Sequence, residues 1–349
     1  MSETGEDGAQ GKNVDNSFFF WTPAEAEEKQ VLQIGVSACG ATGVMNVLCD
    51  LVSSSSCLWS VCLICHLESY AVKTASLSQD LAAGSVLKLP NAVEDVCKHV
   101  QTRLRAQDAA IPEYLHSRSV AGTTHEDLIT GLDGSTQSKV FARFFSFYPH
   151  RDVDLSDWLR SWMKRDVVPV ATLNLQRAVP EGYEIPDAWH HQMIYGVDDK
   201  KVYMCNPLIS EPIASIKEQL FSPSELLIRR DDIMKRYSPD VDLRLIEAHH
   251  DVRWREMKVV DQVYNVIDEE IAIPLPPSEM LRILKQHLFT RHVKIPAAYQ
   301  SGITLCVRTD NQASYDALRN APDLPLLDVT LDDKAMARSE TVCDDVQEK

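Results

Sequence analysis

Cys39 is the cysteine whose sequence surroundings best fit a chemical role. It lies between Gly35 and Gly40, at the point where an apolar periodicity begins. Apolar residues then recur at intervals of three and four, which predicts a helix with one buried face; they are Ala41, Val44, Met45, Leu48 and Val52. A thiol at a helix N-terminus is expected to have a lowered pKa, because the helix dipole stabilises the nucleophilic thiolate. The alternative interpretation is a small buried residue at a helix start.

A second group of polar residues lies on a predicted β-hairpin. Two β-like runs, 190–197 and 201–206, flank a polar stretch centred near Asp198, and Pro207 follows the second run. His190 and Asn206 each lie eight residues from that centre, so we expect them to face each other. A cysteine nucleophile needs a base, and the base needs an orienting group. The Asn206 side-chain oxygen could accept a hydrogen bond from the imidazole; alternatively, His190 is an ordinary structural residue.

These segments together resemble papain-like cysteine peptidases, and most closely the double-glycine leader peptidases and their relatives. In that pattern a glutamine lies six residues before the nucleophilic cysteine, as Gln33 does before Cys39. The histidine begins a strand that reaches a glycine six residues later, as His190 does with Gly196. An asparagine or aspartate follows the histidine by about sixteen residues, which here is Asn206. The order of the four site residues also matches.

The resemblance implies a role for each residue. Cys39 would attack a carbonyl carbon, His190 would accept its proton, and Asn206 would orient His190. The Gln33 amide and the main-chain N–H of Cys39 would form the oxyanion hole. The family often has an aromatic residue after its histidine, whereas this chain has His191. If the strand register is shifted by one residue, His191 is the base and His190 faces away, because neighbouring strand residues point to opposite faces.

The resemblance covers residues 30–52 and 155–210, and it implies a papain-like fold with the nucleophile helix packed on an antiparallel sheet. The element order also indicates the α+β class. Residues 155–163 have the clearest amphipathic pattern, with Asp154 as the expected N-cap. An apolar strand is predicted at 167–173, directly after this helix.

Four segments are predicted along the chain. Residues 1–17 form a disordered acidic tail, 18–235 the papain-like core, and 331–349 a second disordered tail. Residues 236–330 form a C-terminal appendage or a small second domain, or they complete the core. The Pro-rich stretch 274–277 is the clearest boundary within that segment.

Composition excludes several classes of protein. The 349 residues carry 35 basic and 51 acidic side chains, a net charge of −16, and 44% are hydrophobic, which suffices for a core. The acidic balance argues against a nucleic-acid partner, because a phosphate backbone attracts a basic surface. No apolar run is long enough for a membrane span and no secretory signal is found, so we expect a cytoplasmic protein. The nine cysteines are therefore expected to be reduced thiols.

No cofactor or metal is expected. The Cys-rich insert 57–66 ends in a C-x-x-C-H pattern, but the chain lacks the additional ligands that a haem or structural zinc site needs. No phosphate-binding glycine loop or metal-binding carboxylate loop is found. The role of the insert stays open.

The predicted function is a cysteine-dependent hydrolase, a thiol protease that acts on a peptide or protein through an acyl-enzyme on Cys39. An acyltransferase or amidase at the same site is the first alternative, because these residues do not distinguish water from an amine as acceptor. An inactive peptidase-like binding or scaffold protein is the second. The net negative charge favours a positively charged substrate. The sequence defines neither the substrate nor the oligomeric state.

Overall fold

The computed structural model describes residues 16–33, 39–52, 92–179, 183–272 and 289–327. The predictions for most of the two tails, for the Cys-rich insert 57–66 and for the Pro-rich stretch 274–277 lie outside these residues. The described chain combines helices with antiparallel sheets, so it belongs to the α+β class.

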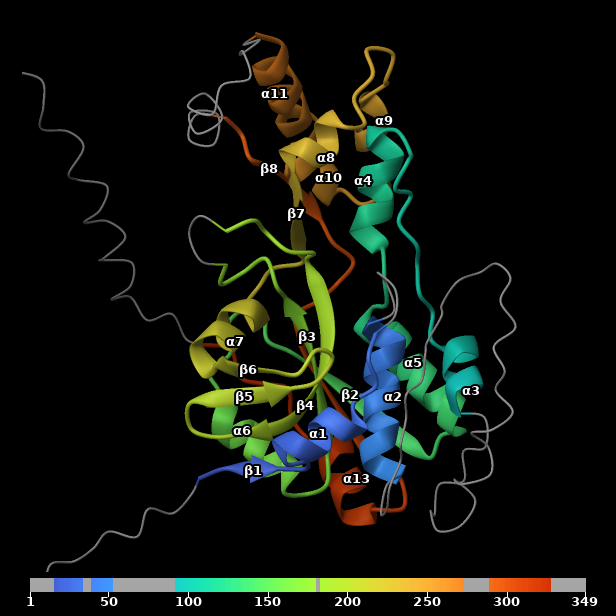
Figure 1. Cartoon of the computed structure of the whole chain (residues 1–349), viewed down its shortest axis with the longest axis vertical. Helices are drawn as coiled ribbons and strands as arrows, with labels where there is room; N and C mark the ends of the chain where they lie inside the picture. The colour runs from blue at the N-terminus through green and yellow to red at the C-terminus, as the bar shows by residue number, and fades with distance from the viewer. Residues whose placement is uncertain (1–15, 34–38, 53–91, 180–182, 273–288, 328–349) are drawn as a thin grey trace, which may run out of the picture.

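A seven-stranded antiparallel sheet forms the centre of the larger of two units (Figure 1). Six strands follow the order β2-β9-β3-β4-β5-β6, and the short β1 pairs with β4. The strands are β1 Phe18–Phe19, β2 Val140–Ser146, β3 Val168–Asn174, β4 Trp189–Val197, β5 Lys201–Met204, β6 Ile209–Pro212 and β9 Gly302–Arg308. The predicted hairpin is confirmed as β4 and β5. Every residue of β3 is buried, because side chains on both faces of the sheet are covered.

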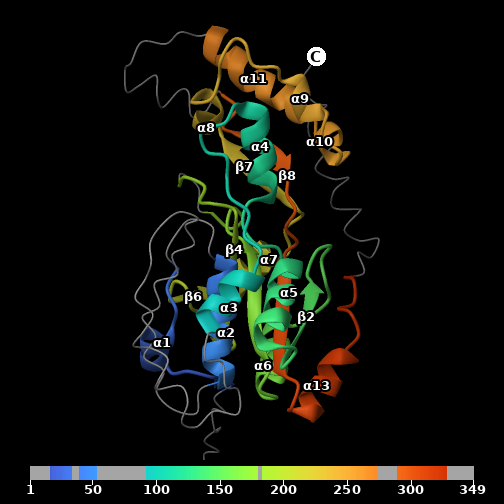
Figure 2. The same ribbon diagram turned by 90° about the vertical axis from the view of Figure 1, so that its right-hand side faces the viewer.

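Helices cover both faces of this sheet (Figures 1 and 2). One face packs against α1 (Pro23–Lys29), α2 (Cys39–Val52), α3 (Ala92–His99) and α5 (His125–Thr136). The other face packs against α6 (Leu155–Met163), α7 (Ile213–Leu220) and α13 (Gln312–Arg319). The predicted helices after Cys39 and at 155–163 are confirmed, and the Asp154 side chain caps α6 by accepting a hydrogen bond from the Asp157 N–H.

A smaller unit lies at one end of the sheet, at the top of Figure 1. It comprises α4 Ile111–Val120, β7 Glu225–Arg229, α8 Arg230–Met234, α9 Arg244–Glu247, α10 Arg253–Glu256, α11 Val259–Ala272 and β8 His292–Pro296. β7 and β8 form a two-stranded antiparallel sheet. The unit has its own apolar core, in which Trp254 is fully buried.

Residues 236–330 divide between the two units. Helices α9 to α11 and strand β8 belong to the smaller unit, whereas β9 inserts between β2 and β3 of the main sheet. Elements after residue 235 thus contribute to both units, because the main sheet takes the strand β9 from near the C-terminal end of the chain.

Candidate active site

Cys39 begins α2, at the end of the larger unit that faces the smaller one (Figure 1). Only 5% of its surface is exposed. The following residue, Gly40, lies directly against Thr123, since a Cβ added to this glycine would come within 2.3 Å of the Thr123 Cβ. Such close contact fixes the start of α2 against the segment that joins α4 to α5.

The pKa of the Cys39 thiol is raised, in contrast to the predicted lowering. Burial is the main cause, and hydrogen bonds from the main chain at His191 and Gly40 offset it only in part. The positive charge of Arg105 also favours the thiolate. The prediction is wrong because it included the helix dipole and omitted desolvation, which depends on the elements that cover the thiol.

His190 lies near the start of β4 and is partly buried. Its Nε2 is 2.7 Å from the main-chain oxygen of Asn206. A carbonyl oxygen can only accept a hydrogen bond, so Nε2 carries the hydrogen and Nδ1 holds the lone pair of the neutral ring. Burial lowers the pKa of His190, with a smaller opposing effect from the Asn206 bond. The imidazole is therefore kept neutral, with its basic atom at Nδ1.

Asn206 contacts His190 as the sequence predicts, but through its carbonyl group rather than its side chain. The Asn206 side chain binds Gln33 instead: Oδ1 accepts the Gln33 N–H at 2.9 Å, and Nδ2 is 3.5 Å from Gln33 Oε1. The Asn206 N–H donates to Gln30 Oε1 at 3.3 Å. Asn206 has a φ of +65°, a left-handed conformation that asparagine tolerates well. One buried residue thus links two of the predicted site residues.

His191 is fully buried, and both of its ring nitrogens are hydrogen-bonded. Nε2 is 2.6 Å from the main-chain oxygen of Thr123, and Nδ1 is 3.0 Å from the Thr172 hydroxyl. Nε2 therefore donates to the carbonyl, while Nδ1 accepts from the hydroxyl. Burial lowers the pKa of His191 to about 4. These contacts give His191 a structural role that joins β4 to β3 and to the segment before α5.

The structure brings three of the four predicted residues together and leaves Cys39 apart from them. Asn206 is hydrogen-bonded to Gln33 through its side chain and to His190 through its main-chain oxygen. Cys39 lies outside this group, and its thiol accepts a hydrogen bond from the main chain at His191. The His191 side chain lies beside Gly43 of α2, whereas His190 pairs with Leu173 and points to the opposite face of β4. Within the described ranges, no hydrogen bond connects the Cys39 thiol to either imidazole ring.

Tyr299 is a residue of this site that the sequence reasoning missed. Its hydroxyl donates to the Ala121 carbonyl at 2.6 Å, and its ring stacks on Trp189 with centroids 5.6 Å apart. Burial and the nearby Cys39 thiol raise the pKa of Tyr299. Tyr299 follows β8, far along the chain from Cys39, and no local pattern marks it. Only the packing of the smaller unit on the larger one places it here.

No family model, curated protein or solved structure matches the chain. No helix in the part of the chain described combines the length and apolar composition that a membrane crossing requires. Among these same residues, no three His, Cys, Asp or Glu side chains are grouped as metal ligands would be. The arrangement around Cys39 and His190 is therefore the basis for assigning a function.

Proposed function

We propose that this protein is a thiol hydrolase of papain-like fold that cleaves peptide amides through an acyl-enzyme on Cys39. The observation that carries the proposal is the hydrogen bond between His190 Nε2 and the Asn206 main-chain oxygen. It fixes the tautomer in which Nδ1 is the basic atom, while burial keeps the ring neutral. A general base requires both properties.

The reaction would begin with a protonated thiol, because the pKa of Cys39 is raised. His190 lies on the face of β4 opposite α2, so substrate binding would have to bring its ring and the Cys39 thiol together. As the sulfur attacks the substrate carbonyl carbon, His190 Nδ1 would then take the thiol proton and donate it to the leaving amine. The Gln33 side-chain amide and the Cys39 N–H would stabilise the oxyanion. Water then attacks the thioester, with His190 again as the base, and releases the acid product and the free thiol.

Asn206 would act as a positioning residue in two ways. Its carbonyl oxygen orients His190, and its side chain holds the segment that carries Gln33. His191 is not proposed as the base, because both of its nitrogens are occupied and burial holds its pKa at about 4. Its role would be to keep β4 in place beside the start of α2.

Site-specific labelling with an electrophilic thiol probe tests the proposal. Cys97 is exposed and serves as a control thiol in the same molecule. Peptide mapping should show that a probe with a peptide-like recognition element labels Cys39 faster than Cys97, despite the burial of Cys39. The His190→Gln variant should label Cys39 roughly a hundredfold more slowly, the lower range for loss of a general base, and should leave Cys97 unaffected. Equal Cys39 labelling in both proteins would refute the proposed base.

Peptide binding without turnover is the second candidate function. It is favoured by the burial of Cys39 and by the raised pKa of its thiol. The labelling experiment separates the two candidates. If Cys39 stays unlabelled while the exposed Cys97 reacts, the hydrolase proposal fails and the binding function is retained.

A further inference from the structure

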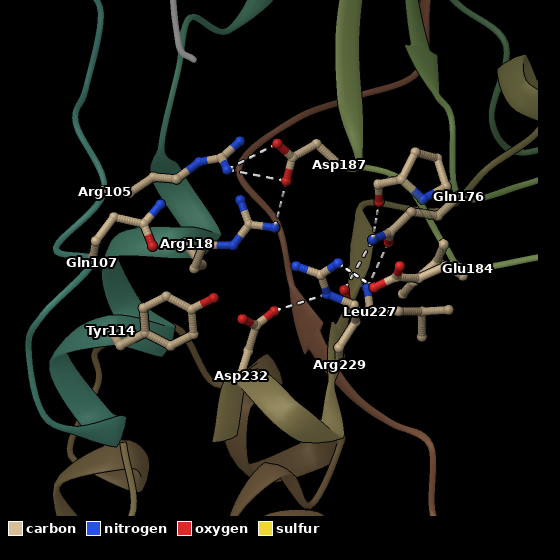
Figure 3. Close-up of a pocket in the computed structure, with 12 residues that line it drawn as sticks. Arg105, Gln107, Tyr114, Arg118, Gln176, Glu184, Asp187, Leu227, Arg229 and Asp232 are labelled. Atoms are coloured by element: carbon tan, nitrogen blue, oxygen red, sulfur yellow. Dashed lines mark hydrogen bonds and ion pairs between the residues drawn. The ribbon is translucent and has the colours of Figure 1, made fainter. Parts of the chain in front are cut away.

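A charged cavity of about 370 Å³ lies between the two units (Figure 3). Its walls come from the segment before α4, from α4 itself, from the stretch that leads into β4, and from β7 and α8. We call it the arginine pocket, after the guanidinium groups of Arg105, Arg118 and Arg229 that line it.

One end of the arginine pocket carries an excess of positive charge. Arg105 Nη1 lies 3.0 Å from both carboxylate oxygens of Asp187, and Arg118 Nη2 lies 3.4 Å from one of them. Two guanidinium groups thus share a single carboxylate, whose side chain is 56% exposed. The Arg118 side chain, by contrast, is only 9% exposed. Burial and the charge of Arg105 lower the pKa of Arg118, which reflects this incomplete compensation.

These two arginines also have unused hydrogen-bond donors. The Nε atoms of Arg105 and Arg118 are buried and have no hydrogen-bond partner in the part of the chain that the structure describes. A buried guanidinium N–H without an acceptor is costly, so such groups are nearly always paired in folded proteins. An added carboxylate would supply the missing negative charge beside these two guanidinium groups.

The other end of the arginine pocket is electrically balanced. Arg229 pairs with Glu184 and with Asp232, and Arg236 also lies 3.8 Å from Asp232. Two arginines therefore face two carboxylates. The uncompensated charge is confined to the end formed by Arg105 and Arg118.

We propose that the arginine pocket binds a carboxylate of the substrate, at the end formed by Arg105 and Arg118. The inference rests on the proposed function, because the pocket adjoins the candidate active site: Asp187 lies three residues before His190, and the charge of Arg105 acts on the Cys39 thiol. A guanidinium fork matches the two oxygens of a carboxylate. The single excess positive charge fits one carboxylate better than a phosphate dianion.

This substrate class differs from the positively charged one that the net charge of −16 favours. The difference is physical, because ligand recognition depends on the charges that line the site, and distant surface charges are screened by salt. The carboxylate could belong to an acidic side chain or to the C-terminus of the substrate. Both present the same group to Arg118.

Binding of short peptides to the full chain tests the proposal. The protein carries Cys39→Ala, so that no turnover occurs, and calorimetry or NMR follows three probes. Acetyl-Ala-Glu-Ala-amide has only a side-chain carboxylate, acetyl-Ala-Gln-Ala has only a C-terminal one, and acetyl-Ala-Gln-Ala-amide has neither. At least one acidic probe should bind about tenfold or more tightly than the neutral probe, because a hydrogen bond to a charged group is worth at least that factor. The probe that binds identifies the source of the carboxylate.

Three further substitutions, each made in the Cys39→Ala protein, show where the acidic probe binds. Arg118→Gln should remove the preference for the acidic probe. Asp187→Asn should strengthen its binding several-fold, because the competing carboxylate is lost and the residue is exposed enough to tolerate the change. Arg244→Gln is the control, since the Arg244 side chain is 86% exposed and pairs with Asp242 on the smaller unit. It should leave all three affinities unchanged.

Two results would overturn the proposal: equal affinity for the acidic and neutral probes, or an Asp187→Asn variant that does not bind the acidic probe more tightly. The Asp187 variant keeps the test decisive even if Arg118→Gln fails to fold. Since binding is measured without turnover, a negative result here with fast labelling of Cys39 refutes only the arginine pocket. A carboxylate preference without Cys39 labelling supports the pocket and refutes the hydrolase.

Discussion

His191 is buried in its neutral form, which makes the stability of the fold depend on pH. Burial lowers its pKa from an ordinary value of 6.5 to about 4. Above pH 6.5 the ring is neutral in both the folded and the unfolded chain, so it contributes no pH dependence. Between pH 6.5 and 4 the unfolded chain binds a proton that the folded chain does not, so the free energy of unfolding falls as the pH falls.

The size of the effect follows from the two pKa values. Each pKa unit corresponds to about 1.4 kcal/mol, so the full loss below pH 4 is roughly 3 kcal/mol. By pH 4.5 about 2.5 kcal/mol of this amount should already be lost relative to pH 7.5. That is a large fraction of the total stability of an ordinary domain.

Urea unfolding at pH 7.5, 6.5, 5.5 and 4.5 measures this contribution. The His191→Gln variant retains an amide N–H that can donate to the Thr123 carbonyl, but it cannot titrate. The wild type should lose about 2.5 kcal/mol more than this variant between pH 7.5 and 4.5. The difference between the two proteins is the relevant quantity, because other groups titrate in both.

Asp50 is the most important of these other groups. Burial raises the pKa of its carboxyl to about 7, so the folded chain retains a proton that the unfolded chain releases above pH 3.8. Its contribution to stability therefore decreases as the pH rises, opposite to that of His191. The Asp50→Asn variant should lose stability in acid more steeply than the wild type. The same pH dependence in wild type and His191→Gln, or an imidazole of His191 that titrates near 6.5 by NMR, would refute the reasoning.

Two further predictions concern the packing around Cys39. Gly40→Ala would place a Cβ within 2.3 Å of the Thr123 Cβ and should cost about 1–3 kcal/mol in urea unfolding. Gly43→Ala is the matched control in the same helix, because its nearest neighbour would be 3.6 Å away, and it should stabilise the protein by up to about 1 kcal/mol. Equal stability of the two variants would contradict the close packing of α2. Tyr299→Phe removes the donor to the Ala121 carbonyl and should cost about 1–3 kcal/mol; a variant with the thermal stability of the wild type would show that this bond contributes nothing.

The elements that the sequence predicts well are those with a strong local pattern. The helix that starts at Cys39, the capped helix α6 and the β4–β5 hairpin all appear where the periodicity places them. Apolar spacing records which side of a segment is buried, so it is sufficient for such elements. The hairpin also brings His190 next to Asn206, as two residues equally far from a turn should be.

Pairings between distant segments could not be predicted in the same way. Strand β9 lies between β2 and β3, and Tyr299 reaches the surroundings of Cys39 from the connection that precedes this strand. No local pattern in the sequence of β9 specifies which strands it pairs with. The smaller unit likewise takes its elements α4, β7 and β8 from three separate parts of the chain. Only packing brings these elements together.

The sequence by itself determined the residue types at the candidate site, their order, and the helix and hairpin that carry them. The tertiary structure decided how they interact: the Asn206 carbonyl accepts a hydrogen bond from His190, both nitrogens of His191 are occupied, and the Cys39 thiol has a raised pKa. It also decided that Arg105 and Arg118 share one carboxylate. The physical reason is that hydrogen-bond partners, desolvation and local charge depend on atoms brought together from distant parts of the chain, whereas periodicity and spacing depend on neighbours in sequence.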